Sequence, residues 1–200
     1  MIVIVDYGMG NLHSVYKALE RLNVKAIVSS SPKDIEKADK LILPGVGHFK
    51  KGMENLKSLN LIPILNKKVL EEKTPILGIC LGIQLFTKHS EEGNVPGLGW
   101  IDAETVKLKD INLKIPHMGW NSINIKKQNP IFSNINQDEQ FYFVHSYHVA
   151  PKDKEIVSST SSYGKEFVSS IRKDNIYGVQ FHPEKSHSAG LKILKNFADL

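Results

Sequence analysis

The sequence predicts a single α/β domain over residues 1–200, with a central mixed, mostly parallel sheet flanked by helices. Short β-branched runs alternate with amphipathic stretches over the first half of the chain, which is typical of parallel βαβ units. In the second half, strand-like runs follow one another with only turns between them, which indicates partly antiparallel pairing. Neither a repeat nor a low-complexity linker divides the chain, and its length suits one domain.

The elements follow in order from the local patterns. In the first half, expected strands are short apolar runs that end at turn-forming residues, namely 2–5, 26–29, 41–43 and 75–79. One expected helix begins at Asn11 and another at Ser31-Pro32, with proline at the first helical position. Three further expected helices cover 48–58, 61–72 and 81–88. The second half adds expected strands at 101–108, 122–125, 141–144, 156–160, 168–171 and 176–181, and a helix at 188–200.

Charge and composition exclude several classes of protein. The net charge is +5, but the lysines are scattered and no aromatic residues interleave with a basic stripe, so we expect no nucleic-acid partner. No stretch approaches the roughly 20 apolar residues of a membrane span, and the start lacks signal-peptide features. A single cysteine excludes an internal disulfide and fits a reducing compartment. We therefore expect a cytoplasmic protein without a membrane partner.

That one cysteine, Cys80, lies in Gly78-Ile79-Cys80-Leu81-Gly82, between a predicted strand and a predicted helix. G-x-C-x-G at this place is the thiol version of the nucleophile elbow, in which glycines allow close approach of strand and helix. The helix N-terminus also favours the thiolate. A buried structural cysteine is the alternative, and this motif taken alone does not decide between the two.

His182 and Glu184 favour the catalytic interpretation. They follow the apolar run 176–181, so they lie at the end of a predicted strand. Residues i and i+2 of an extended chain face the same way, and Glu184 can therefore hold one ring nitrogen of His182. The other nitrogen is then free to take a proton from Cys80, as in a nucleophile–base–carboxylate triad.

Other glycine and histidine patterns carry less information. Pro44-Gly45-Val46-Gly47 ends another strand, and its amides, together with the amide of Leu81, suit a developing oxyanion, although a plain turn is the alternative. Gly8-Met9-Gly10 lacks the third glycine and the acidic residue of a dinucleotide site, so we expect no cofactor. His145 and His148 are expected to point to opposite faces of a strand, so we expect no metal site.

Three motifs, PGVGHF, GICLGIQLF and GVQFHPEKS, resemble in order and spacing the signature of class I (triad-type) glutamine amidotransferases. The resemblance covers essentially the whole chain and implies their flavodoxin-like fold and a glutaminase activity. It implies that Cys80 attacks the glutamine side-chain amide, that His182 is the general base and acid, and that Glu184 orients it. It further implies that Gly47 and Leu81 form the oxyanion hole and that Gln84 helps to hold the substrate.

Within that family, the segments DYGMGNL, PHMGWN, YFVHSY and HPEKS are similar to the glutaminase subunits of imidazole glycerol phosphate synthases. This resemblance implies a heterodimer with a (β/α)₈ cyclase subunit, which receives the ammonia and binds the acceptor in histidine biosynthesis. The matching interface positions are Asn11, Trp120, Tyr142 and Lys185. His187 departs from the family, which commonly has glutamine there.

Two other functions stay open at this point. A paralogous glutaminase subunit would have the same sequence motifs while supplying ammonia to another acceptor, for example in the amidination of a surface sugar. A binding protein on the same fold would catalyse nothing, although the intact Cys80, His182 and Glu184 speak against it.

Overall fold

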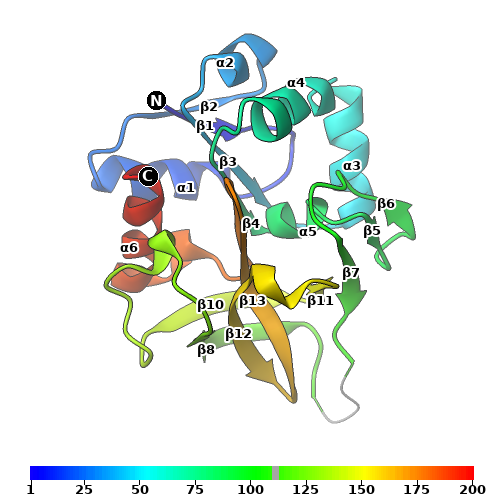
Figure 1. The fold of residues 1–200 in the computed structure, drawn as a ribbon, viewed down its shortest axis with the longest axis vertical. Coiled ribbons are helices and arrows are strands. Elements are labelled where there is room, and N and C mark those ends of the chain that lie inside the picture. Colours follow the sequence, from blue (N-terminus) through cyan, green and yellow to red (C-terminus); the bar gives the residue numbers. More distant parts are fainter. Residues whose placement is uncertain (110–112) are drawn as a thin grey trace.

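The computed structural model describes residues 1–109 and 113–200 of the chain. Its centre is one mixed sheet with the strand order β2-β1-β3-β4-β14-β13-β12-β9. Figure 1 shows β1, β3 and β4 of this sheet between the helices. The parallel strands are β2 (Ala26–Ser29), β1 (Ile2–Val5), β3 (Lys40–Gly45), β4 (Ile76–Cys80) and β14 (Ile176–Val179). The antiparallel strands are β13 (Lys165–Lys173), β12 (Val157–Tyr163) and β9 (Asn124–Ile125). The predicted mixed α/β sheet is confirmed.

The inner parallel strands β1, β4 and β14 are buried on both faces, which explains their largely apolar sequences, whereas the edge strand β2 is half-exposed. In β1, Val3 and Val5 belong to one core cluster and Ile2 and Ile4 to the other, because successive side chains alternate between the faces. The first five strands have the order of flavodoxin-like folds, in which ligands bind at the carboxyl ends of the strands.

Helices cover the two faces of this sheet. On one face lie α1 (Leu12–Arg21) and α6 (His187–Ala198). The other face is covered by α2 (Pro32–Glu36), α3 (Phe49–Ser58), α4 (Ile62–Asn66) and α5 (Leu81–Leu85), with a π-helix at Lys67–Glu71. The predicted starts at Asn11 and Ser31 are the observed N-cap positions of α1 and α2. Within the described ranges, no helix is long and apolar enough to cross a membrane.

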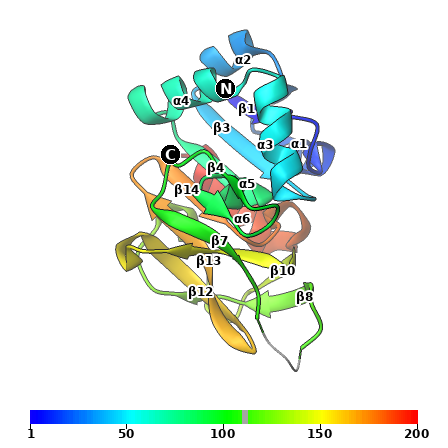
Figure 2. The same cartoon turned by 90° about the vertical axis from the view of Figure 1, so that its right-hand side faces the viewer.

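Two small sheets lie beside the central one, and Figure 2 shows their strands β7, β8 and β10 below the parallel half of the molecule. One sheet pairs β10 (Gln140–His145) with β8 (His117–Ser122). The other has the order β11-β7-β5-β6, formed by Tyr147–Pro151, Ala103–Lys107, His89–Ser90 and Val95–Pro96. Short 3₁₀ helices occupy Pro130–Phe132, Lys154–Ile156 and Pro183–Lys185.

Several predicted boundaries are wrong. The helix expected over 81–88 ends at Leu85, because the carbonyls of Leu85 and Phe86 accept hydrogen bonds from Leu98 and Trp100 of a later loop. The helix expected over 61–72 divides into α4 and the π-helix. The run 122–125 is no single strand, since Ser122 ends β8 and residues 124–125 form β9.

The strands expected at 101–108 and 141–144 are present as β7 and β10, but they pair outside the central sheet. The last expected strand stops at Val179 rather than residue 181. Beyond it, the amide of His182 donates to the carbonyl of Tyr142 in β10, so the chain no longer pairs with β4 and β13 there. These differences depend on contacts between distant segments, which local patterns do not report.

Candidate active site

Cys80 ends β4 in a backbone conformation that few side chains adopt, with φ 53° and ψ −105°. The flanking glycines permit this turn. A Cβ on Gly82 would lie 1.8 Å from the carbonyl oxygen of Leu43, and one on Gly78 would lie 2.7 Å from the amide nitrogen of Ile83. The predicted nucleophile elbow is thus present as a geometry, and it fixes the thiol at the carboxyl end of the sheet.

His182 reaches the same edge from the neighbouring strand. β14 pairs with β4 in parallel register, with Val179 opposite Ile79, so the two strands end side by side. His182 Nδ1 and Glu184 Oε1 lie 2.8 Å apart, and each side chain is 2% exposed. The predicted contact is present, but residues 183–185 form a 3₁₀ turn, so the extended-chain reasoning behind it is wrong.

The protonation of His182 follows from its neighbours. Burial lowers the pKa of the imidazole, but the charges of Cys80 and Glu184 and their hydrogen bonding outweigh burial and raise it to about 10. Its Nε2 atom is buried and has no hydrogen-bond partner among the described residues. At neutral pH His182 therefore carries a proton, and Nδ1 donates to Glu184 Oε1.

A hollow of about 330 Å³ opens above the thiol. Its lining includes four residues that the sequence analysis expected at one site, namely Gly47, Cys80, Leu81 and Gln84. Val46 of the same loop lines it as well. Gly47 has φ +104°, a conformation that favours glycine. Further lining comes from Glu92, Pro116, Val144, His145, Ser146 and Tyr147.

Two buried glutamines connect this hollow to the thiol. Gln84 Nε2 donates to the Tyr147 carbonyl at 2.8 Å and to Gln180 Oε1 at 3.0 Å. Gln180 Nε2 in turn donates to Cys80 Sγ at 3.7 Å. Sequence reasoning did not single out Gln180, although a polar residue at the end of a buried apolar run two positions before His182 is a signal that could have found it.

A second series of buried hydrogen bonds, which includes His145, lies next to the hollow. His145 Nδ1 donates to the Tyr147 carbonyl at 2.9 Å, which leaves His145 Nε2 to accept from His117 Nδ1 at 3.0 Å. His117 Nε2 then accepts from Asn121 Nδ2 at 3.3 Å. Burial lowers the pKa of His145 to about 3 and that of His117 to about 4, so both rings are neutral. His148 lies on a different strand from His145, β11 rather than β10.

The positions expected at a partner interface form a surface patch, which we call the aromatic patch. Trp120, 44% exposed, packs edge-to-face on Tyr142 with ring centroids 5.9 Å apart. Lys185 Nζ lies 5.7 Å from the Tyr142 ring, and His187 stacks on Trp120 at 4.8 Å. Asn11 lies outside these contacts and caps α1, where its side chain accepts from the amide of Ser14.

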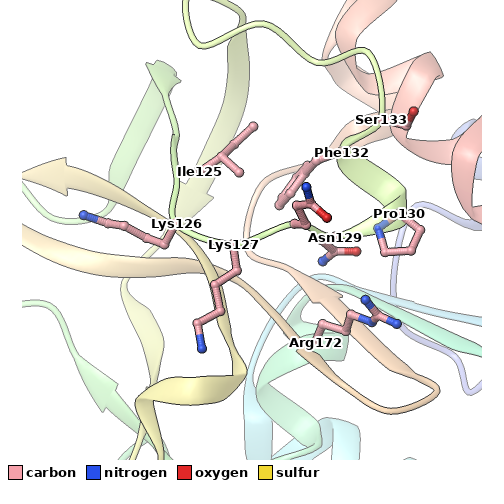
Figure 3. A pocket seen from close by; sticks show the side chains of 9 residues that line it. Ile125, Lys126, Lys127, Asn129, Pro130, Phe132, Ser133 and Arg172 are labelled. Atoms are coloured by element: carbon pink, nitrogen blue, oxygen red, sulfur yellow. The ribbon is translucent and has the colours of Figure 1, made fainter.

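A larger hollow of about 640 Å³ lies away from the thiol, between β9, the Pro130 turn and Arg172 of β13 (Figure 3). Its two lysines are already in ion pairs, Lys126 with Glu166 and Lys127 with Glu155. None of its lining residues is an expected site residue. The size of a hollow therefore does not identify the active site. The gathering of the expected site residues around Cys80 does.

Comparison with known proteins agrees with this geometry. The sequence model of the family described as glutamine amidotransferase class-I matches residues 3–200. The imidazole glycerol phosphate synthase subunit HisH 2 of Methanococcus maripaludis is 55% identical over 198 residues, covering 98% of each chain. Subunit HisH 1 of the same organism is 49% identical over 205 residues, covering both chains fully.

Among solved structures, a chain of PurLQS from Thermotoga maritima superposes with a TM-score of 0.72 at 17% identity, covering 99% of this chain and 97% of that one. At that identity the likeness shows the fold alone. The family match over nearly the whole sequence, together with the full-length relatives, establishes that this chain belongs to the class-I glutamine amidotransferases.

Proposed function

We propose that this chain is the glutaminase subunit of an imidazole glycerol phosphate synthase. The observation that carries the proposal is the placement of Cys80 and His182 at the ends of two paired strands, with Glu184 on the histidine ring. The full-length similarity to subunits of that synthase supports the choice of enzyme.

The residues divide the reaction into two steps. His182 takes the thiol proton of Cys80, and Sγ attacks the side-chain amide carbon of glutamine, so that the oxyanion that forms accepts hydrogen bonds from the amides of Gly47 and Leu81. His182 passes its proton to the departing nitrogen, which leaves as ammonia, and a glutamyl thioester remains on Cys80. His182 then takes a proton from water, whose oxygen attacks the thioester and releases glutamate.

The atoms and protons of both steps come from groups of this chain, from glutamine and from water, so the proposed reaction uses no cofactor. Gln84 and Glu92 line the hollow above Cys80, where the two ends of glutamine need polar partners. We assign Gln84 to substrate binding on this basis. Glu184 keeps the proton-bearing ring aligned with the thiol and transfers no proton itself.

The partner in this proposal is a (β/α)₈ cyclase subunit that forms a heterodimer with this chain in the cytoplasm. The cyclase binds the acceptor, and ammonia passes through its barrel without mixing with solvent. The products are imidazole glycerol phosphate and aminoimidazole carboxamide ribotide. We assign the docking surface to the aromatic patch, and with it Asn11, because the exposed Trp120 and the half-buried Tyr142 are of residue types typical of interfaces.

The test measures glutamate release by the chain alone, with the cyclase, and with cyclase plus an acceptor analogue. We expect release to rise at each step, because Gly47 allows the adjoining peptide to rotate and its amide to be withheld until the partner is loaded. Cys80→Ser should abolish glutamine-dependent synthesis and spare synthesis from added ammonium. Loss of both reactions in a folded complex would contradict the proposal.

A second candidate function needs a direct test because M. maripaludis has two such subunits, both similar to this chain over its full length. In this alternative the chain supplies ammonia to another acceptor. Complementation of a histidine auxotroph that lacks its own glutaminase subunit separates the two. Growth without histidine supports the synthase, and glutamate release without growth supports the other acceptor.

A further inference from the structure

Tyr7 is a fully buried residue whose hydroxyl has no hydrogen-bond partner among the described residues. It lies two residues beyond the end of β1, and its backbone carbonyl accepts a hydrogen bond from Asn55 Nδ2 at 2.9 Å. The backbone is therefore fixed while the polar end of the side chain is unsatisfied. Most buried hydroxyl groups in proteins are paired, so an unpaired one calls for a physical explanation.

The hydroxyl points at the junction between the expected oxyanion loop and the nucleophile. A Cβ on Gly45 would lie 2.3 Å from the Tyr7 oxygen and 2.8 Å from Leu81 Cβ. Gly45 is in turn the register partner of Cys80 across β3 and β4. Tyr7 is not among the residues that line the hollow above the thiol, so its hydroxyl contacts the loop from outside that hollow.

The protonation state makes this group a donor. Burial raises the pKa of the Tyr7 phenol far above its ordinary value, and the charge of Cys80 raises it further. The phenol therefore keeps its proton at all working pH values. A buried O–H without an acceptor disfavours the conformation in which it is left unpaired.

We propose that Tyr7 is a positioning residue for the loop Pro44–Gly47, donating a hydrogen bond to a loop carbonyl when the loop takes its active conformation. This inference rests on the proposed glutaminase function. Rotation of a peptide between Gly45 and Gly47 moves one carbonyl by about half a turn and gives the phenol an acceptor. Tyr7 thereby favours the conformation that presents the loop amide to the oxyanion, by the differential interaction it makes in the two states.

The test is Tyr7→Phe in the complete complex of this chain with its cyclase partner. The variant removes only the oxygen atom and keeps the buried ring. We expect kcat for glutamine hydrolysis in the unliganded complex to fall about three- to tenfold, the usual effect of one net hydrogen bond, with KM unchanged. The melting temperature of the isolated chain should stay the same or rise, because no existing hydrogen bond is lost.

Tyr163→Phe is the matched control, because the Tyr163 hydroxyl already donates to the carbonyl of Lys114 at 2.6 Å. The same chemical change there should lower the melting temperature and leave kcat unaffected. The inference is overturned if Tyr7→Phe leaves kcat unchanged, or if it lowers the melting temperature as the control does. A wild-type complex that releases no glutamate would overturn the proposed function and this inference with it.

Discussion

The buried histidines His117 and His145 predict a loss of stability in mild acid. Both rings are neutral in the folded chain, where burial holds their pKa values at about 4 and about 3. In the unfolded chain a histidine titrates near pH 6.5. The unfolded state therefore binds more protons than the folded state between about pH 6.5 and pH 3, and stability falls as the pH is lowered through this range.

The magnitude follows from the two pKa values of each group. Between pH 7 and pH 5 the unfolded chain holds on average about 0.7 proton per histidine while the folded chain holds almost none, which costs about 2 kcal/mol for each ring. The pair therefore costs about 4 kcal/mol. His182 acts in the opposite direction, since its folded pKa is raised to about 10. It recovers about 1 kcal/mol over the same interval.

The assay is urea unfolding of the isolated chain at pH 7 and pH 5, compared between wild type and His145→Gln. Glutamine can donate to Tyr147 and accept from His117, but it does not titrate. We expect the loss of stability between the two pH values to shrink by about 2 kcal/mol in the variant, whatever its stability at pH 7. His13→Gln, the same substitution at an exposed histidine, is the control variant. Equal pH dependence in His145→Gln and wild type would refute a neutral buried pair.

Three further predictions concern the elbow and the triad. His182→Asn should lower glutamine turnover by roughly 10²–10⁴ with little effect on KM, as expected for loss of proton transfer. Glu184→Gln should cost less in the same assay, because the ring keeps an acceptor on Nδ1; a loss as large as that of His182→Asn would mean that Glu184 does more than orient. Gly82→Ala should destabilise the chain by about 1–3 kcal/mol in urea unfolding, since its Cβ would overlap the Leu43 carbonyl. The loss should exceed that of Gly52→Ala, whose Cβ would lie 3.3 Å from Leu85 Cδ2.

The sequence was informative wherever a local pattern determines the structure. The apolar runs ending at Val5 and Ile79 predict parallel strands, because burial on both faces leaves no room for polar residues there. The glycines around Cys80 predict the elbow, because a close approach of backbones tolerates no larger side chain. His182 and Glu184 are neighbours in sequence, so their contact needed no tertiary information.

The parts that escaped prediction depend on distant partners. The amides of Leu98 and Trp100 donate to the carbonyls of Leu85 and Phe86 at the end of α5. The local sequence around Leu98 and Trp100 does not predict these hydrogen bonds. β8 pairs with β10 through His117–Ser122, where every second residue is exposed and the exposed side carries the apolar Met118 and Trp120. The unpaired hydroxyl of Tyr7 is the clearest case, since only the packing of Gly45 and Leu81 around it reveals that it lacks a partner.

The pairing of β4 with β14 also determines when the site can exist during synthesis. Gln180 contacts Cys80 across 100 positions of sequence, and His182 comes later still. At a translation rate of about 5–20 residues per second, β4 waits roughly 5–20 seconds for the strand that completes it. During that interval the ribosome-bound chain has an open strand edge beside a thiol without its histidine. With the roles proposed for Cys80 and His182, unfinished chains do not consume glutamine, and their open strand edge favours aggregation.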